Sequence, residues 1–210
     1  MNNIKIIYDT MNDLPENIDG KYDIDMLPTT IIFQGKEYKA GVDIDNDEFY
    51  KLLRDNKEIP TTSQVTYMTF KETFEKYVKE GKKVLYMAGS SKGSGTYQSA
   101  MLAKNDIESD DIYIFDTYSL CIGGGLLVLE AAKMVEEGLD IDTIIKKLEE
   151  YKDKVNIGKC DVDDNADLPA QFGVRNIPTV LFIKDGKVVD KQVGATTKAA
   201  LKEKVEALLK

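Results

Sequence analysis

The sequence has 210 residues, of which 42% are hydrophobic and 31% are charged, a composition typical of a globular protein in water. Its 37 acidic residues outnumber the 28 basic ones, which gives a formal net charge of −9. This balance argues against a nucleic-acid partner, because a phosphate-binding face needs an excess of Lys and Arg. No apolar run approaches the roughly 18 residues of a membrane-spanning helix, and the N-terminus lacks the layout of a signal peptide. We therefore expect a cytoplasmic protein that does not insert into a membrane.

Histidine is absent, and this excludes the catalytic and zinc sites that are built on imidazole. The two cysteines, Cys121 and Cys160, form no CxxC pair. The acidic runs 43–47 and 161–164 lack the EF-hand pattern and are interpreted as solvated loops or helix caps. We expect no metal site, no cofactor and no catalytic residue.

In the first half of the chain, apolar β-branched runs alternate with segments of helical spacing. The expected strands and helices, in chain order, are a strand at 4–8, a hairpin of strands 29–33 and 37–39, helices at 45–54 and 66–80, a strand at 84–88 and a helix at 97–104.

The second half of the chain continues the alternation. We expect a strand at 112–115, a helix that ends before Gly138, a helix at 143–152, a strand at 155–162, a short helix at 167–172, strands at 179–184 and 188–193, and a final helix at 198–209. The Asp-Gly turn between the last two strands predicts an antiparallel hairpin. The whole pattern predicts an α/β fold with an open, mostly parallel sheet and helices on both faces.

Two loops carry candidate binding groups. The Gly89–Thr96 loop leaves a strand and opens a helix, so its backbone N–H groups and hydroxyls could form an anion site. It is equally consistent with a glycine-rich turn that binds nothing. The Pro60–Gln64 segment places hydroxyls ahead of a helix, either as a helix cap or as donors at the carboxyl edge of the sheet.

Residues 1–151 resemble the N-terminal part of DegV-family proteins. The resemblance is carried in order by several segments, which are 9–15, 27–33, 37–44, 60–64, 90–100 and 116–131. It implies a lipid-binding module whose loops hold the carboxylate of a long-chain fatty acid and which is not an enzyme. The expected ligand residues are Thr62, Ser63, Ser91, Ser94, Gly95 and Thr96. The family's kinase partner is a further implied contact.

Residues 152–210 resemble the C-terminal half of thioredoxin, through segments 155–165, 172–175, 177–179, 182–187 and 193–195. The resemblance implies a βαββα arrangement and a cis peptide bond at Ile177–Pro178. The thioredoxin CxxC is absent, so this part is expected to be redox-inactive.

The two resemblances predict a DegV-like domain at 1–151 and a thioredoxin-like part at 152–210 that share the helix at about 141–152. The second part either extends the first sheet or forms a separate lobe. Two alternatives to lipid binding are a recombined or engineered chimeric scaffold with no retained ligand function, and residual thiol chemistry at Cys121.

Overall fold

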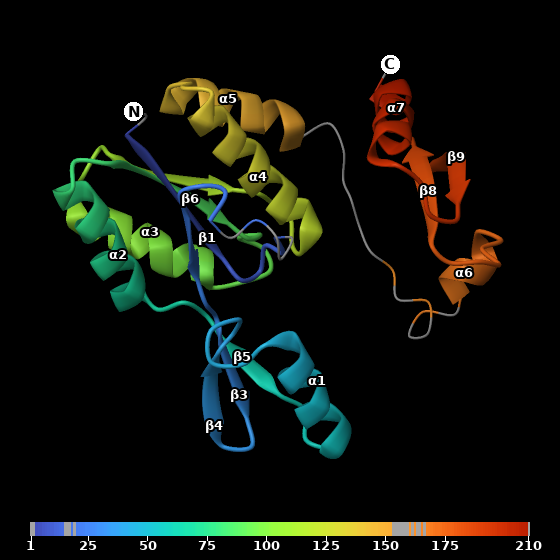
Figure 1. Ribbon diagram of the computed structural model, residues 1–210, viewed down its shortest axis with the longest axis horizontal. Coiled ribbons are helices and arrows are strands. Elements are labelled where there is room, and N and C mark those ends of the chain that lie inside the picture. The colour runs from blue at the N-terminus through green and yellow to red at the C-terminus, as the bar shows by residue number, and fades with distance from the viewer. Residues whose placement is uncertain are drawn as a thin grey trace. The chain divides into compact units, whose positions relative to one another are not determined.

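The computed structural model describes residues 3–14, 18, 20–152, 160, 162, 165 and 167–209. It divides into two compact units, Met1–Asn156 and Ile157–Lys210 (Figure 1).

The first unit is built on a parallel sheet. Its strands are β1 (Ile4–Asp9), β2 (Ile24–Leu27), β6 (Lys83–Ala88) and β7 (Ile112–Asp116). They lie in the order β2-β1-β6-β7, and each neighbouring pair is parallel. All residues of β1 are buried, as expected for a strand covered on both faces. The open parallel sheet predicted from the sequence is confirmed.

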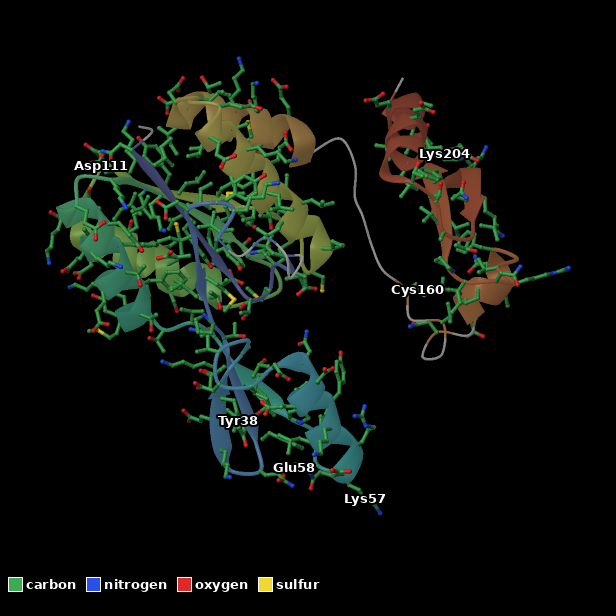
Figure 2. All side chains as sticks on the ribbon, viewed as in Figure 1. Tyr38, Lys57, Glu58, Asp111, Cys160 and Lys204 are labelled. Atoms are coloured by element: carbon green, nitrogen blue, oxygen red, sulfur yellow. The ribbon has the colours of Figure 1, made fainter. Side chains whose placement is uncertain are left out.

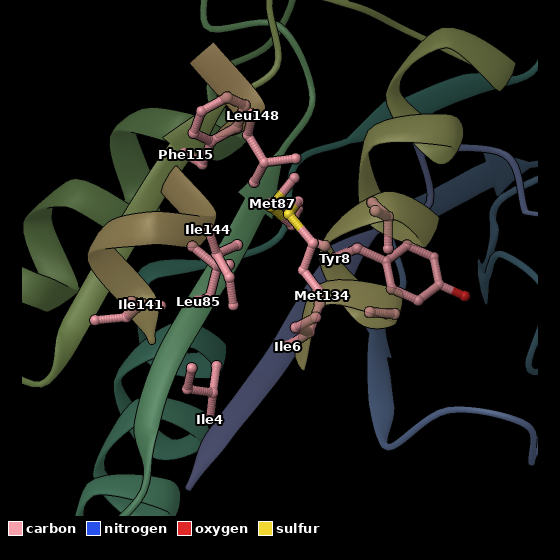
Figure 3. Packing of buried hydrophobic residues seen from close by; sticks show 13 residues of the cluster. Ile4, Ile6, Tyr8, Leu85, Met87, Phe115, Met134, Ile141, Ile144 and Leu148 are labelled. Atoms are coloured by element: carbon pink, nitrogen blue, oxygen red, sulfur yellow. The ribbon is translucent and has the colours of Figure 1, made fainter. Parts of the chain in front are cut away.

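Alternate side chains of these strands enter two separate cores. One core joins Ile4, Ile6 and Leu85 to helices α4 (Ile122–Glu136) and α5 (Ile141–Lys152) (Figure 3). The other joins residues of the opposite face to α2 (Tyr67–Lys79) and α3 (Thr96–Ile107). Helices therefore cover both faces of the sheet, because side chains of a strand alternate in direction.

A second, antiparallel sheet holds the predicted hairpin. It consists of β3 (Thr30–Phe33), β4 (Lys36–Lys39) and β5 (Thr61–Ser63) in the order β4-β3-β5. Helix α1 (Asn46–Asp55) follows the hairpin, and the Asp45 side chain caps it by accepting a hydrogen bond from the Glu48 N–H.

Two strands were not expected from the sequence. The edge strand β2 is short and only partly buried, and β5 is a polar, exposed segment. Pairing with a neighbouring strand, rather than an apolar pattern, defines both of them.

The second unit contains α6 (Asp167–Gln171), β8 (Thr179–Lys184), β9 (Lys187–Val193) and α7 (Lys198–Leu209). Strands β8 and β9 form the predicted antiparallel hairpin, and the Ile177–Pro178 peptide bond is cis, as the thioredoxin resemblance implied. Most of the strand predicted at 155–162 lies outside the described residues. Lys204 of α7, labelled in Figure 2, pairs with Asp190 of β9 at 2.5 Å. Its ammonium also lies 5.6 Å from the Phe182 ring centroid, so α7 is fastened to the hairpin.

Candidate functional site: the carboxyl edge of the parallel sheet

The loops that follow β1, β6 and β7 meet at the carboxyl edge of the parallel sheet. The chain passes from β1 to β2 on one side and returns to β6 on the other, so the topological switch point lies between β1 and β6. Open α/β sheets bind ligands outside the carboxyl ends of their strands at such a point. Backbone hydrogen bonds join the loops there: Ser90 N–H donates to Ser119 O at 3.0 Å, and Cys121 N–H donates to Met11 O at 2.6 Å.

The segment after β5 is fastened to the β6–α3 loop. The Val65 N–H donates to the Thr96 hydroxyl at 3.3 Å, and the Gln64 side-chain amide donates to the Ser99 hydroxyl at 3.0 Å. Gly95 lies directly beneath Gln64, since a Cβ at Gly95 would overlap the Gln64 side-chain oxygen. The structure thus brings together the two segments that the sequence analysis selected separately.

The backbone of the β6–α3 loop differs from the expectation that its N–H groups face a ligand. Most of them donate within the protein, to the acceptors Asp9 Oδ2, Ser119 O, Asp116 Oδ1, Ser90 Oγ, Ser90 O and Ser94 Oγ. The loop uses these bonds to fold on itself and to attach to β1 and β7. The groups left to meet a ligand are mainly its side chains.

The predicted site residues divide into exposed and buried groups. Thr62 and Ser63 are exposed, and Ser91, Ser94 and Gly95 are half-buried. Thr96 is fully buried, and its hydroxyl accepts from Val65 and from Ser94, at 3.3 and 3.0 Å. In this structure Thr96 therefore joins the two segments instead of facing outward.

Thr62 and Ser63 are consecutive residues of strand β5, where Ile31 pairs with Thr62 and Thr30 pairs with Ser63. Consecutive side chains of a strand point to opposite faces. One face of β5 can therefore present only one of these two hydroxyls.

Exposed apolar side chains border the hydroxyl groups. Tyr118, Leu120 and Ile122, at the β7–α4 junction, are 53%, 45% and 56% exposed. Leu120 lies against the β6–α3 loop, because its Cδ1 would be 3.5 Å from a Cβ at Gly93. Polar donors and an apolar strip are thus adjacent at one edge of the sheet, an arrangement suited to an amphipathic molecule.

A buried carboxylate, which the sequence analysis did not single out, supports these loops. Asp9 is 0% exposed and accepts hydrogen bonds from Tyr86 OH at 2.5 Å, Met11 N–H at 2.9 Å and Gly89 N–H at 3.2 Å. Burial raises the pKa of Asp9, although the three hydrogen bonds oppose the shift. The signal in the sequence was an aspartate that directly ends an apolar strand.

Asn12 is the second buried polar residue behind the loops. Its side-chain amide donates to Met87 O at 3.1 Å, while its Oδ1 has no hydrogen-bond partner among the described residues. The oxygen fills space that a Cβ at Gly124 would occupy. Gly124 therefore allows the β1–β2 loop to approach α4 closely.

The two cysteines belong to different units. Cys121 is exposed and precedes α4 with a φ of 56°, and Cys160 is exposed in the second unit. Within the described residues, no three acidic or cysteine side chains are grouped as a metal site. Among the helices that the structure describes, none combines the length and apolar character needed to cross a bilayer.

Two family models match this chain. The model "Uncharacterised protein, DegV family COG1307" matches residues 3–158, and the thioredoxin model matches residues 140–207. Both matches include α5, the helix at Ile141–Lys152.

Curated relatives extend the first match. A DegV domain-containing protein of Clostridium perfringens is 40% identical over 155 residues, which cover 74% of this chain and 56% of that protein. Another, from Caldanaerobacter subterraneus, is 37% identical over 207 residues, which cover 92% of this chain and 73% of that protein. The chain thus spans about half of the first relative's length, and the second alignment continues beyond the DegV model into the C-terminal unit.

A solved structure agrees with the sequence comparisons. A Thermotoga maritima protein described as revealing fatty acid binding function is 29% identical, with a TM-score of 0.66, over 99% of this chain and 77% of that one. Since the DegV model covers well over half of the residues and the relatives exceed 30% identity, this chain belongs to the DegV family.

Proposed function

We propose that the first unit binds a long-chain fatty acid, without catalysis, at the carboxyl edge of its parallel sheet. The observation that carries the proposal is the meeting of two hydroxyl-bearing segments beside an exposed apolar strip. Gln64 and Val65 hold the β5 segment against the β6–α3 loop, and Leu120 lies against the same loop. Support also comes from the Thermotoga maritima relative, which is described as binding fatty acid.

In this proposal the Thr62 and Ser91 hydroxyls contact the head group. Thr62 is exposed on β5 and Ser91 is half-buried in the β6–α3 loop. Ser94 and Gly95 lie in the same loop as Ser91 and contribute secondary contacts or shape. Ser63 points to the face of β5 opposite to Thr62, and the buried Thr96 links the two segments. The hydroxyls orient the head group, and the acyl chain supplies most of the affinity, since each buried CH₂ contributes about 0.8 kcal/mol.

The first test is direct detection of a ligand. The purified chain is analysed by native mass spectrometry and then extracted with solvent to identify any co-purified fatty acid. A stoichiometric acid supports the proposal. A folded protein that neither carries a fatty acid nor takes one up on addition contradicts it.

The second test assigns the head-group contacts. Thr62→Ala combined with Ser91→Ala is expected to weaken fatty-acid binding by roughly tenfold to a hundredfold, the effect of losing two hydrogen bonds of about 1 kcal/mol each. Thr61→Ala is the matched control, because Thr61 is exposed on the same strand one position earlier and points to the opposite face. Unchanged affinity in the double variant would remove these residues from the site.

We further propose that the C-terminal unit is thioredoxin-like but does not exchange thiols and disulfides. The thioredoxin model match, the β8–β9 hairpin with α7 and the cis Ile177–Pro178 bond support the likeness. The sequence offers only Cys121 and Cys160, which lie in different units. Insulin reduction by the chain is expected to be no faster than by its Cys121→Ser variant; a clear difference would favour thiol chemistry. A chimeric origin is a separate hypothesis, and the DegV alignment over 92% of the chain gives it no support.

A further inference from the structure

A carboxylate lies directly against the proposed head-group site. Asp116 ends strand β7 and is half-buried, and its Oδ1 accepts hydrogen bonds from the Ser91 N–H at 3.2 Å and the Tyr118 N–H at 3.0 Å. The hydroxyl of Ser91 is a proposed head-group donor, and the backbone N–H of the same residue already donates to a negatively charged side chain. This arrangement is the opposite of a site built to receive an anion.

The charged and titratable groups around Asp116 come from each neighbouring element. Tyr86 of β6 and Tyr97 of α3 both respond to the charge of Asp116, and Tyr86 donates to Asp9 at the end of β1. Tyr118 donates its N–H to Asp116, and Lys92 of the β6–α3 loop lies over the Tyr118 ring. Lys92 is the cation among them, and its exposed ammonium lies 5.6 Å from the Tyr118 ring centroid.

The negative charge of Asp116 affects the pKa of two tyrosines at this edge of the sheet. Burial, and then the charges of Asp9 and Asp116, raise the pKa of Tyr86 well above its ordinary value. Burial, and then the charge of Asp116, also raise the pKa of Tyr97. With most backbone N–H groups of the loop already bonded inside the protein, few fixed donors remain to offset a second negative charge.

We infer that a carboxylic acid binds this site with its proton, which it shares with the Asp116 carboxylate, an inference that rests on the proposed fatty-acid function. Two carboxyl groups that share a site retain one proton between them, because both cannot be ionised at short distance without a large cost. The acid's O–H donates to Asp116, and the Ser91 and Thr62 hydroxyls donate to its carbonyl oxygen.

The proton balance follows from this arrangement. At pH 7.5 the free acid is an anion in solution, so its binding takes up one proton from the buffer. A fatty alcohol already carries the O–H donor and binds without taking up a proton. Asp116 thereby selects head groups that present a hydrogen-bond donor.

The test is isothermal calorimetry of the full chain with decanoic acid, below its aggregation concentration, at pH 7.5 in phosphate and in Tris. The two buffers differ in ionisation enthalpy, so the difference in binding heat counts the protons taken up. We expect about one proton per decanoic acid and none for 1-decanol, the matched neutral probe. The measurement on the unmodified protein tests the inference even if a variant fails to fold.

Two variants sharpen the result. Asp116→Asn keeps the Oδ1 acceptor for Ser91 and Tyr118 but removes the charge, so proton uptake is expected to vanish and decanoate affinity at pH 7.5 to rise about tenfold, the equivalent of one pKa unit. Lys92→Gln is expected to leave proton uptake unchanged, because Lys92 is not the partner of the acid.

Several outcomes would overturn the inference. Decanoate binding without proton uptake would show that the anion itself is bound, and loss of binding in Lys92→Gln would identify Lys92 as its counter-ion. Equal weakening of both probes in Asp116→Asn would give Asp116 a merely structural role. Failure of the folded wild type to bind either probe would instead contradict the proposed fatty-acid function, and the inference with it.

Discussion

At the residue scale, two buried charged side chains show how the sheet accommodates polar groups. Lys5 is the second residue of β1 and has 3% of its surface exposed, and it pairs with Asp23 and with Asp25, the latter at 2.7 Å. Asp9, at the end of the same strand, is fully buried beneath the candidate site. A sequence pattern marks both as interruptions of an apolar run, but only the partners explain why they are tolerated.

The Lys5 pair predicts a bell-shaped pH effect on stability. Burial opposes the charge on Lys5, but hydrogen bonds to Asp23 and Asp25 outweigh it, so the pKa of Lys5 is raised from 10.5. Burial likewise opposes the charge on Asp25, yet hydrogen bonds from Lys5 and Tyr77 leave its pKa below 3.8. The stabilisation by Lys5 is lost as the pH rises through its raised pKa, and that by Asp25 as the pH falls through its lowered pKa.

Lys5→Met is therefore expected to lower the free energy of unfolding by about 1–2 kcal/mol between pH 5 and 9 and by less at either extreme. Urea denaturation from below pH 4 to above pH 10.5 measures the effect, because both transitions lie outside the range of pH 5 to 9. Lys79→Met is a control, since Lys79 pairs with Glu75 on the surface of α2. A deficit that is the same at every pH would show that lost packing, and not the charge, is responsible.

Asp9 is expected to change the free energy of unfolding with pH in the direction opposite to the effect of Asp25. Because burial raises its pKa above 3.8, the folded state binds the proton more tightly, and stability falls as the pH rises from about 4 through the folded pKa. Asp9→Asn loses an acceptor for Tyr86 and Gly89, at a cost of about 1–3 kcal/mol. The variant is nevertheless expected to gain on the wild type as the pH rises, which urea denaturation between pH 4 and 8 would show. A difference independent of pH would contradict the buried charge.

At the element scale, the close approach of loop and helix depends on glycine. A Cβ at Gly125 in the first turn of α4 would overlap the Asp13 carbonyl, which is backbone and cannot rotate away. Gly124 and Gly125 therefore let the β1–β2 loop lie against α4.

Gly125→Ala is expected to destabilise the first unit by about 1–3 kcal/mol, because the loop must move. The direction of the stability change is informative, because a Gly to Ala substitution in a helix ordinarily stabilises the protein by up to about 1 kcal/mol. Gly93→Ala serves as control: its Cβ would meet Leu120 Cδ1 at 3.5 Å, an ordinary contact. Thermal unfolding compares the two variants, and an increase in stability for Gly125→Ala would refute the proposed close packing.

Element prediction from sequence succeeded where periodicity and capping were strong. Helix α2, capped by Thr66, and the β8–β9 hairpin with its Asp-Gly turn lie where they were expected. The pattern missed β5 because the Thr61–Ser63 segment is polar and exposed, and its strand character comes only from pairing with β3. That pairing also places Thr62 and Ser63 on opposite faces, which the sequence alone could not specify.

At the scale of the whole molecule, the two units have separate cores. The first unit buries Phe74 among the residues of α2, α3 and the sheet, and the second buries Phe182 on the hairpin beside α7. In the described part of the second unit, the sheet has two strands and few side chains are buried, so the stability of this unit is expected to be the lower of the two.

A reciprocal pair of substitutions tests this separation. Phe74→Ala is expected to lower the free energy of unfolding of the first unit by about 3–5 kcal/mol. Phe182→Ala is expected to reduce the protection of backbone amides from hydrogen exchange in the second unit alone. Hydrogen exchange followed by mass spectrometry reports each unit separately. Loss of protection throughout the chain from either substitution would indicate one cooperative unit.

The sequence by itself determined the fold class, the order of most elements and the two hydroxyl-bearing segments, because apolar periodicity, caps and turns are local properties. Only the tertiary structure decided which donors can meet a ligand. Most backbone N–H groups of the β6–α3 loop form hydrogen bonds inside the protein, and Thr96 is buried where it links the two segments. The Asp116 carboxylate accepts a hydrogen bond from the Ser91 N–H. These outcomes depend on contacts between residues far apart in the chain, which no local pattern records.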